Sequence, residues 1–323
     1  MKAIVYERYG SPGVLQYVEI ERPTPRDHEV LIRGRAAAVN PLDWVWMRGT
    51  PYILRLIGGL RKPRDKRTGA DIAGVVEAVG RKVTQFKPGD EVFGMCKGAF
   101  AEFACAPESA CALKPPGITF QQAAALPVAA VSALQSLRDK GKLQPGQQVL
   151  INGAAGGVGS FAVQIAKAFG AQVTGVCSTR NLDLVRSLGA DHVLDYTQQD
   201  ITQDAQRYDL FLDCIGNHPL LACRRILKPK GIYVAVGGPI HNWLSPFDDL
   251  LKTIVLSAFV SQTFAPFFAK VTAQDLNAVA QLTASGKVTP VIEKVYPLRE
   301  VPDAIRSIET RHTRGKIVIA LDH

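Results

Sequence analysis

The chain has 323 residues, of which 47% are hydrophobic, and it carries a formal net charge of +9. Because this length exceeds the usual limit of a single hydrophobic core, two domains are expected, and the hydrophobic content excludes a disordered chain. The sequence has no run of about 18 apolar residues, and its apolar start ends at Glu7 and Arg8, so it predicts neither a membrane span nor a signal peptide. We expect a soluble, cytoplasmic protein.

Residues 1–120 contain short β-prone runs, such as 30–39 and 72–79, which glycine and proline interrupt. This pattern predicts a mainly-β domain. Within it, seven basic residues and a single acid, Asp65, stand between Arg48 and Arg67. A solvated loop would account for them, but they also fit a positive patch near a ligand entrance or an anionic membrane surface.

A different pattern begins at residue 148, where a short apolar run turns into a glycine-rich loop that ends at Gly159. Apolar residues then recur every three or four positions up to Phe169, which is the spacing of a helix that Gly170 can end. Such a loop can hold a phosphate, because Gly156 lets the backbone approach it and the helix N-terminus offers free N–H groups. Ala154 replaces the first glycine of the usual pattern, and glycines also mark ordinary turns.

The segment after this loop alternates strands with helices. Strands are expected at residues 173–177, 192–195, 208–214 and 231–236, and helices at 181–188 and 219–227. Near-continuous apolar strands separated by helices predict a parallel sheet covered on both faces, the doubly wound α/β fold that binds nucleotides. A C-terminal segment follows, with helices at 273–285 and 301–310, a short apolar region at about 288–296 and a last strand at 316–320, and we expect it to rejoin the first domain.

Several of these motifs resemble a known family. Residues 69–74 and 88–94 resemble the GroES-like catalytic domain of the medium-chain dehydrogenase/reductase superfamily. Residues 146–167 are similar to the signature of its zinc-independent, zeta-crystallin-like quinone oxidoreductase branch. The resemblance implies a GroES-like catalytic domain formed by residues 1–122 and 268–323, a Rossmann NADP-binding domain formed by residues 123–267, and a homodimer.

The chain departs from the zinc-dependent members of that superfamily at their metal ligands. It has Asn40 where they carry the catalytic Cys, and Ala70 where they carry the His of a Gly-His-Glu motif. Its six cysteines form no CxxC pair, and no two of its histidines have the spacing that is typical of metal ligands. Without a thiolate and an imidazole at these positions we predict that no metal is bound and that alcohols are not oxidised.

The turn after the second strand of the nucleotide domain indicates the cofactor. An NAD site would place an acid there, whereas this chain has Ser178 and Arg180, which can bind the 2′-phosphate of NADPH. Alternatively the two residues are an N-cap and a surface charge. The resemblance adds Tyr196 against the same phosphate. It also implies cofactor contacts along the glycine loop and near the nicotinamide, at Ser132, Ala155, Gly156, Gly157, Val158, Gly159, Ile215, Val236, Gly237 and Gly238.

Asn40 and Asp43 match the residues that replace metal ligands in the quinone oxidoreductase branch. By this resemblance, Asn40 would hydrogen-bond a carbonyl or the nicotinamide amide, and Asp43 would orient its neighbours or relay a proton. An Asx-turn at Asn40 is the alternative. Tyr52 is a further candidate for the proton donor.

We therefore expect an NADPH-dependent reductase of quinones or of α,β-unsaturated carbonyl compounds, enones and alkenals, since a conjugated acceptor spreads the incoming charge without a metal. Reduction of another activated carbonyl is a second possibility. From a different class comes a nucleotide-binding protein with little turnover that binds RNA or an anionic membrane through its basic surface. Weak association with such a membrane remains an expectation, and nucleic acid is the less favoured partner.

Overall fold

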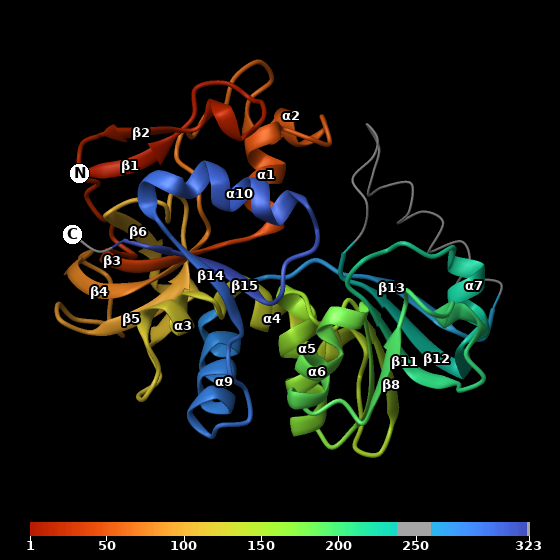
Figure 1. Cartoon of the computed structure of the whole chain (residues 1–323). Helices are drawn as coiled ribbons and strands as arrows, with labels where there is room; N and C mark the ends of the chain where they lie inside the picture. The colour runs from red at the N-terminus through yellow and green to blue at the C-terminus, as the bar shows by residue number, and fades with distance from the viewer. Residues whose placement is uncertain (238–259, 322–323) are drawn as a thin grey trace. The chain divides into compact units, whose positions relative to one another are not determined.

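The computed structural model describes residues 1–237 and 260–321, and the chain divides into two compact units (Figure 1). The first unit comprises Met1–Val131, Val271–Gly286 and Pro290–His323. The second comprises Ser132–Lys270 and Lys287–Thr289. The last strand of the chain pairs with a strand of the first unit, so the C-terminal segment rejoins that unit as the sequence predicts.

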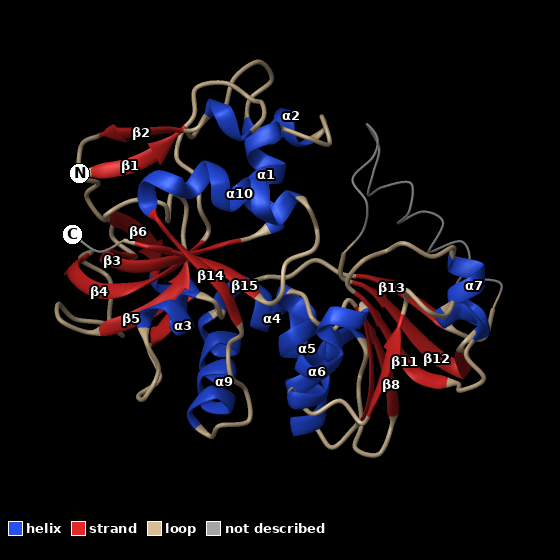
Figure 2. Ribbon diagram, viewed as in Figure 1, coloured by secondary structure: helices blue, strands red, loops and turns tan. Residues whose placement is uncertain are grey.

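A seven-stranded sheet lies at the centre of the first unit (Figure 2). Its strands follow the order β14-β15-β3-β4-β5-β7, and β6 also pairs with β3. The strand bounds are β3 Glu29–Val39, β4 Asp71–Val79, β5 Glu91–Met95, β6 Phe103–Pro107, β7 Cys111–Leu113, β14 Ile292–Pro297 and β15 Lys316–Ala320. The length of β3 lets it pair with β4, β6 and β15, so it connects the early strands to the C-terminal one. A separate hairpin joins β1, Lys2–Val5, to β2, Gln16–Glu19.

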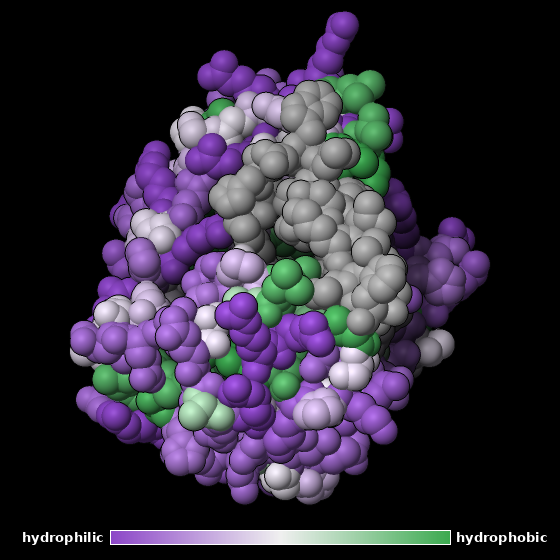
Figure 3. Space-filling view, turned by 90° about the vertical axis from the view of Figure 1, so that its right-hand side faces the viewer, coloured by the Kyte–Doolittle hydropathy of each residue, from purple (hydrophilic) through white to green (hydrophobic). Residues whose placement is uncertain are grey.

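The core of the first unit is built from alternating strand residues and from aromatic rings. Ile32 and Ile72 on neighbouring strands are fully buried, and Phe100 and Met47 pack in the same cluster. Most large apolar side chains among the described residues are buried in this way, and the surface in Figure 3 is mainly hydrophilic with apolar patches.

Short helices cover the first unit. They are α1 Pro41–Arg48, α2 Leu54–Gly58, α3 Phe120–Ala124, α4 Pro127–Gln135, α9 Ala273–Ala284 and α10 Val301–Glu309, with α4 continuing into the second unit. The start of α1 follows from its sequence, because Asn40 is the N-cap, Pro41 is the first helical residue and the Asp43 carboxylate accepts the Asn40 N–H at 2.7 Å. Gly49 ends the helix in the left-handed conformation, with φ of 59°.

The second unit contains a six-stranded parallel sheet in the order β10-β9-β8-β11-β12-β13. The strands are β8 Gln148–Asn152, β9 Gln172–Cys177, β10 His192–Asp195, β11 Tyr208–Asp213, β12 Leu227–Ala235 and β13 Thr263–Pro266, and the helices are α5 Gly157–Ala168, α6 Leu182–Ser187 and α7 Leu220–Arg225. Starting at β8, the chain adds β9 and β10 on one side of this strand. It then crosses back and adds β11, β12 and β13 on the other side. The order reverses between β8 and β11, which makes this the switch point where such sheets bind ligands.

These elements confirm the predicted doubly wound α/β fold with a mainly-β partner. The strands and helices expected between residues 148 and 236 are present within a few residues of their predicted ends. Gly170 and Gly189 follow α5 and α6 with φ of 78° and 100°, as helix-ending glycines do. Helices α1, α2, α3 and α4 were not predicted from the sequence.

Candidate functional site

The carboxyl edge of the parallel sheet brings several predicted residues together. Asn152, Asp213 and Ala235 end β8, β11 and β12, and they lie at one register because Asp213 pairs with both neighbours. The segments that follow these three strands therefore share one edge, and they hold the glycine loop, Ile215, Val236 and Gly237. Gly238 lies outside the described residues. This is the edge, at the switch point, where the fold binds its ligands.

The glycine loop ends in an uncapped helix N-terminus. Gly156 is the N-cap of α5, and no side chain caps the helix. The helix starts close to the end of β8, because a Cβ on Gly159 would stand 2.1 Å from the carbonyl oxygen of Gly153. Gly157 and Val158 form the first turn beside it, and Ala155 is buried. An open N-terminus held close to the strand end fits an anionic phosphate group.

Asp213 organises the neighbouring loop, and the sequence analysis did not single it out. Its Oδ1 accepts the backbone N–H groups of Ile215 at 3.0 Å and Gly216 at 2.8 Å, and also the Asn152 amide at 3.0 Å. Its Oδ2 accepts the hydroxyl of Tyr233 at 2.8 Å. A strand that ends in an acid with a glycine three residues later is a signal that could have identified this residue, because a buried acid usually binds nearby N–H groups.

The turn after β9 carries Ser178 and Arg180 at the same sheet edge. Ser178 is half-buried and accepts the Asn181 amide at 3.3 Å, while Arg180 is exposed. Tyr196 follows β10, the strand next to β9, and is 48% exposed. The predicted binding residues for a 2′-phosphate therefore come from adjacent strand ends.

A carboxylate that the sequence analysis overlooked also lies against this turn. Asp195 ends β10, and its oxygens accept the hydroxyl groups of Thr179 at 2.5 Å and Thr197 at 2.7 Å. The hydrogen bond from Thr179 lowers the pKa of Asp195, so this carboxylate is charged at neutral pH. Because it accepts hydrogen bonds from two threonines, the Asp195 carboxylate points towards the turns that hold them.

The first unit holds a buried polar cluster that contains Asn40 and Asp43. The Asn40 amide donates to Asp71 Oδ2 at 2.9 Å, and its carbonyl oxygen accepts from Lys316 Nζ at 2.6 Å. Lys316 Nζ also donates to the Val39 carbonyl at 3.0 Å and lies 3.6 Å from Asp71 Oδ2. All four polar side chains are at most 4% exposed, so the cluster is shielded from water.

Burial changes the charge states in this cluster. It raises the pKa of Asp43 to about 7, with the Asn40 N–H opposing it and the negative charge of Asp71 adding to it. Burial likewise raises the pKa of Asp71, against the attraction of Lys316, and lowers the pKa of Lys316. Asp43 is therefore a group that can hold or release a proton near neutral pH.

Asp71 connects this cluster to α4. Its Oδ1 accepts the backbone N–H of Val128 at 3.1 Å, in the first turn of that helix. The carboxylate thus stabilises an otherwise unpaired helix N–H and the positive end of the helix. Ser132, a predicted cofactor residue, lies on the same helix and is 6% exposed.

Tyr52, the candidate proton donor, lies at the surface in the turn before α2. Its ring is 41% exposed and stacks on the Arg55 guanidinium, 4.5 Å from the ring centre. Within the described part of the chain, no group of three or more His, Cys, Asp or Glu side chains could hold a metal ion.

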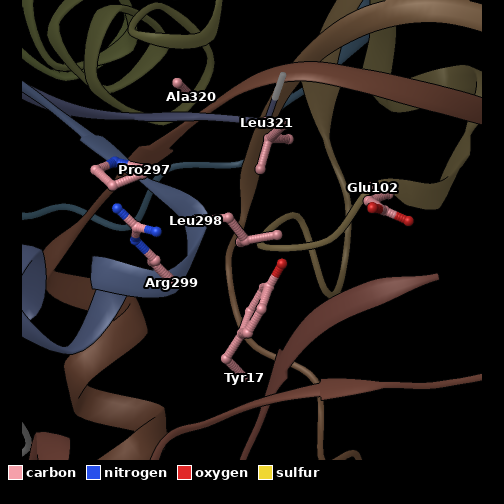
Figure 4. A pocket seen from close by; sticks show the side chains of 7 residues that line it. All are labelled: Tyr17, Glu102, Pro297, Leu298, Arg299, Ala320 and Leu321. Atoms are coloured by element: carbon pink, nitrogen blue, oxygen red, sulfur yellow. The ribbon is translucent and has the colours of Figure 1, made fainter. Parts of the chain in front are cut away.

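A surface cavity of about 310 Å³ lies elsewhere in the first unit (Figure 4). Residues from β2, from the ends of β14 and β15 and the segments that follow them, and from the loop at residue 102 line it: Tyr17, Glu102, Pro297, Leu298, Arg299, Ala320 and Leu321. The Tyr17 ring points towards Leu298 in this view. None of the predicted site residues lines this cavity.

Comparison with known proteins places the chain in a family. It matches the family models described as "Alcohol dehydrogenase GroES-like domain" over residues 26–116 and "Zinc-binding dehydrogenase" over residues 188–319. It is 35% identical to the mitochondrial NAD(P)H oxidoreductase RTN4IP1 of Mus musculus, over 99% of this chain and 89% of that protein. It is 34% identical to the chloroplastic NADPH-dependent alkenal/one oxidoreductase of Arabidopsis thaliana, over 99% of this chain and 79% of that protein.

The solved structure of the quinone oxidoreductase from Coxiella burnetii is similar over 99% of both chains, with a TM-score of 0.87 and 27% identity. Fold and sheet edge thus define a Rossmann-type dinucleotide-binding unit joined to a GroES-like one. The chain belongs to the medium-chain dehydrogenase/reductase superfamily, in its quinone oxidoreductase-like branch. The predicted resemblance is confirmed. Among the described helices, none is both long and apolar enough to span a bilayer.

Proposed function

We propose that this protein is an NADPH-dependent oxidoreductase that transfers a hydride to a quinone or to an α,β-unsaturated carbonyl compound, an enone or alkenal. The observation that carries the proposal is the glycine loop at the switch point, which presents the open N-terminus of α5 beside the turn of Ser178 and Arg180. The names of relatives support the reaction class, since one is an NADPH-dependent alkenal/one oxidoreductase and a similar structure is a quinone oxidoreductase.

The residues of the second unit fit NADPH as a ligand. The backbone from Ala155 to Gly159 would hold the pyrophosphate, with Gly157 and Val158 supplying N–H groups of the first helical turn. Ser178, Arg180 and Tyr196 would hold the 2′-phosphate. Bound NADPH supplies the hydride. The residues assigned to the nicotinamide end are Ser132, Ile215, Val236, Gly237 and Gly238.

In the first unit we assign Asn40 and Asp43 to the reaction. Lys316 and Asp71 fix the orientation of the Asn40 amide by hydrogen bonds at its oxygen and nitrogen. Asn40 would hydrogen-bond a carbonyl oxygen through its remaining N–H, whose contact with the Ala38 carbonyl is long at 3.3 Å. Asp43 would supply the proton that the product needs after hydride transfer, since its pKa of about 7 leaves it partly protonated at neutral pH. Tyr52 stays a further candidate for the proton donor.

We also propose that residues 1–122 and 268–323 act as a catalytic domain and residues 123–267 as an NADP-binding domain. A homodimer and a cytoplasmic location stay predictions of the sequence. Size measurement in solution and localisation of the tagged protein test them.

The proposal is tested by comparing a conjugated substrate with its saturated analogue. With NADPH present, an enone should be reduced and the matching ketone should not, because conjugation spreads the developing oxyanion charge that a metal would otherwise stabilise. Asn40→Ala should lower turnover about 10²- to 10³-fold, the typical effect of losing one oxyanion donor. NADPH binding by this variant should persist.

Equal rates with the enone and the ketone would contradict the proposal, as would oxidation of simple alcohols with NADP. Binding of NADPH with no oxidation by any quinone, enone or alkenal would instead favour the nucleotide-binding protein of little turnover. The control is that the Asn40→Ala variant is still folded at the assay temperature, because the substitution also removes hydrogen bonds from a buried cluster and should lower the melting temperature.

A further inference from the structure

Three large aliphatic side chains are exposed at one place on the first unit. Leu56 and Ile57 on α2 are 62% and 71% exposed, and Leu60, just after this helix, is 67% exposed. In Figure 3 a group of apolar side chains stands at the top of the view, at the height that α2 has in Figure 1. Isolated exposed leucines are common on proteins, but a group within five residues indicates an interaction surface.

Cationic side chains follow this apolar group directly. Arg61, Lys62 and Arg64 are all exposed, and none of them forms an ion pair with a described residue. The neighbouring Lys66 differs, because it is neutralised by Glu7 at 2.6 Å. Three positive charges that form no ion pair within the described part of the chain thus border three exposed aliphatic side chains, in a protein of net charge +9.

The segment is held in place from beneath. The hydroxyl of Tyr9 donates to the Gly59 carbonyl at 2.7 Å, and Arg55 donates to the Gly49 carbonyl at 2.9 Å. The Arg55 guanidinium also lies over the rings of Tyr9 and Tyr52, at 4.6 and 4.5 Å from their centres. Because these contacts use the inward-facing groups, Leu56, Ile57 and Leu60 remain directed at solvent.

A tight turn then brings the cations beside the apolar group. Gly59 has φ of 119°, and a Cβ there would stand 2.1 Å from the Lys62 carbonyl oxygen. The backbone N–H of Arg64 donates to the Gly58 carbonyl at 2.7 Å, which closes the turn against the end of α2. The turn therefore places residues 61–64 next to the helix instead of leading them away from it.

We propose that Leu56, Ile57, Leu60, Arg61, Lys62 and Arg64 form a docking surface for an anionic lipid bilayer. The aliphatic side chains enter the boundary between headgroups and acyl chains, while the cations stay among the anionic headgroups. This interaction is independent of the proposed reaction and goes beyond it. It would place the protein at the lipid bilayer, in which apolar small molecules dissolve.

The composition of the surface favours a bilayer over the other occupants that it could have. A second copy of this chain would bring three like charges against three more at a two-fold contact, which is repulsive. RNA would pair with the cations but would leave the aliphatic side chains without partners, since bases stack on aromatic and guanidinium groups. An anionic bilayer satisfies both kinds of side chain.

The test is co-sedimentation with vesicles of phosphatidylcholine alone and of phosphatidylcholine in which about one lipid in four is phosphatidylglycerol. The wild type should bind the anionic vesicles and not the neutral ones. Neutralisation of the three cations, R61Q/K62Q/R64Q, should weaken binding roughly 100-fold, from the contribution of each charge near such a surface. The apolar triple variant, L56S/I57S/L60S, should weaken it about tenfold or more.

A matched control exists on α7, where Leu221 is 61% exposed and Arg225 is exposed beside it. The L221S/R225Q variant should bind as the wild type does. Unchanged melting temperatures and NADPH affinities would show that all three variants are folded.

Failure of the wild type to bind anionic vesicles at low salt would overturn the proposal. Wild-type binding by the apolar triple variant would overturn it too, because adsorption would then depend on charge alone. If the α7 control lost as much vesicle binding as the two triple variants, the proposal would be wrong, because binding would then follow the net charge of the protein and not these six residues. Binding of a single-stranded RNA more tightly than the vesicles, unaffected by the apolar substitutions, would assign the surface to nucleic acid instead.

Discussion

At the scale of single residues, Arg180 should decide the choice between NADPH and NADH. A charge-assisted hydrogen bond contributes about 1.5–3 kcal/mol, so Arg180→Ala should raise the Michaelis constant for NADPH about 10- to 100-fold. The constant for NADH should change little, because NADH has no 2′-phosphate. Initial rates with both cofactors at a fixed acceptor concentration provide the measurement.

Arg186→Ala is the control for this substitution. Arg186 is an exposed arginine on the adjoining helix, and it pairs with Asp183 at 3.1 Å. Its loss should leave both Michaelis constants unchanged. Equal use of NADPH and NADH by the wild type would reject the assignment, and the charged Asp195 carboxylate beside Thr179 would then be the group to study as a ribose partner.

A second prediction concerns the proton on Asp43. Its folded pKa of about 7 lies above the value of about 3.9 for an unfolded chain, so between these pH values the folded protein holds a proton that the unfolded chain has lost. This contribution therefore stabilises the fold at low pH and disappears as the pH rises towards 7. Asp43→Asn has no such proton and can still accept the Asn40 N–H. Its stability relative to the wild type should rise between pH 4 and pH 7.

Urea unfolding of both proteins at several pH values measures this difference. Asp183→Asn removes a carboxylate that is 99% exposed, and its difference from the wild type should be small and the same at each pH. If Asp43→Asn behaves in that way too, Asp43 does not carry a proton in the folded protein near neutral pH.

The residues that sequence reasoning could find are those with local patterns. Asn40 and Asp43 stand three positions apart in one motif, and Ser178 and Arg180 share one turn. Lys316 and Asp71 complete the Asn40 cluster from 276 and 31 residues away, and no spacing in the sequence connects them. Only the pairing of β15 and β4 with β3 places their side chains against Asn40.

At the scale of elements, the start of α5 offers a matched pair of glycines. A Cβ on Gly159 would stand 2.1 Å from the Gly153 carbonyl, which forces helix and strand apart, whereas a Cβ on Gly156 would meet the same oxygen at 3.3 Å. Gly159→Ala should therefore destabilise the protein by about 1–3 kcal/mol, as overpacking does. Gly156→Ala should change stability little and weaken NADPH binding, because its Cβ would face the phosphate.

Thermal unfolding and titration with NADPH separate the two effects. The prediction is wrong if Gly159→Ala melts with the wild type, or if Gly156→Ala binds NADPH with unchanged affinity. The first result would mean that the loop can move away from α5 without cost. The second would mean that the Cβ at residue 156 does not face the phosphate.

The parallel sheet could be predicted because its strands are apolar runs that alternate with helices of clear periodicity. The four missed helices lack that signal. Almost every residue of α4 is buried, so it has no polar face, and α2 and α3 have five residues each. A usable signal did exist for α1, since Asn40, Pro41 and Asp43 together form the start of a capped helix.

At the scale of the whole molecule, the prediction that no zinc is bound can be argued from all of its thiols. The six cysteines are free, and four of them are buried. Burial raises the pKa of Cys111 to about 12 and that of Cys177 to about 11. Such thiols are protonated at neutral pH, and a metal would have to displace the proton before it could bind.

The position that holds a metal ligand in zinc-dependent relatives adds an electrostatic reason. The Asn40 carbonyl oxygen and the Asp71 carboxylate lie 2.6 and 3.6 Å from the Lys316 ammonium. Because this positive charge interacts with both groups, it would repel a divalent cation at the same place. Elemental analysis of the purified protein should therefore find far less than about one zinc per chain. Chelation by EDTA should leave the NADPH-dependent rate unchanged. Stoichiometric zinc that is lost together with activity on chelation would show that Asn40 and Ala70 have been misread.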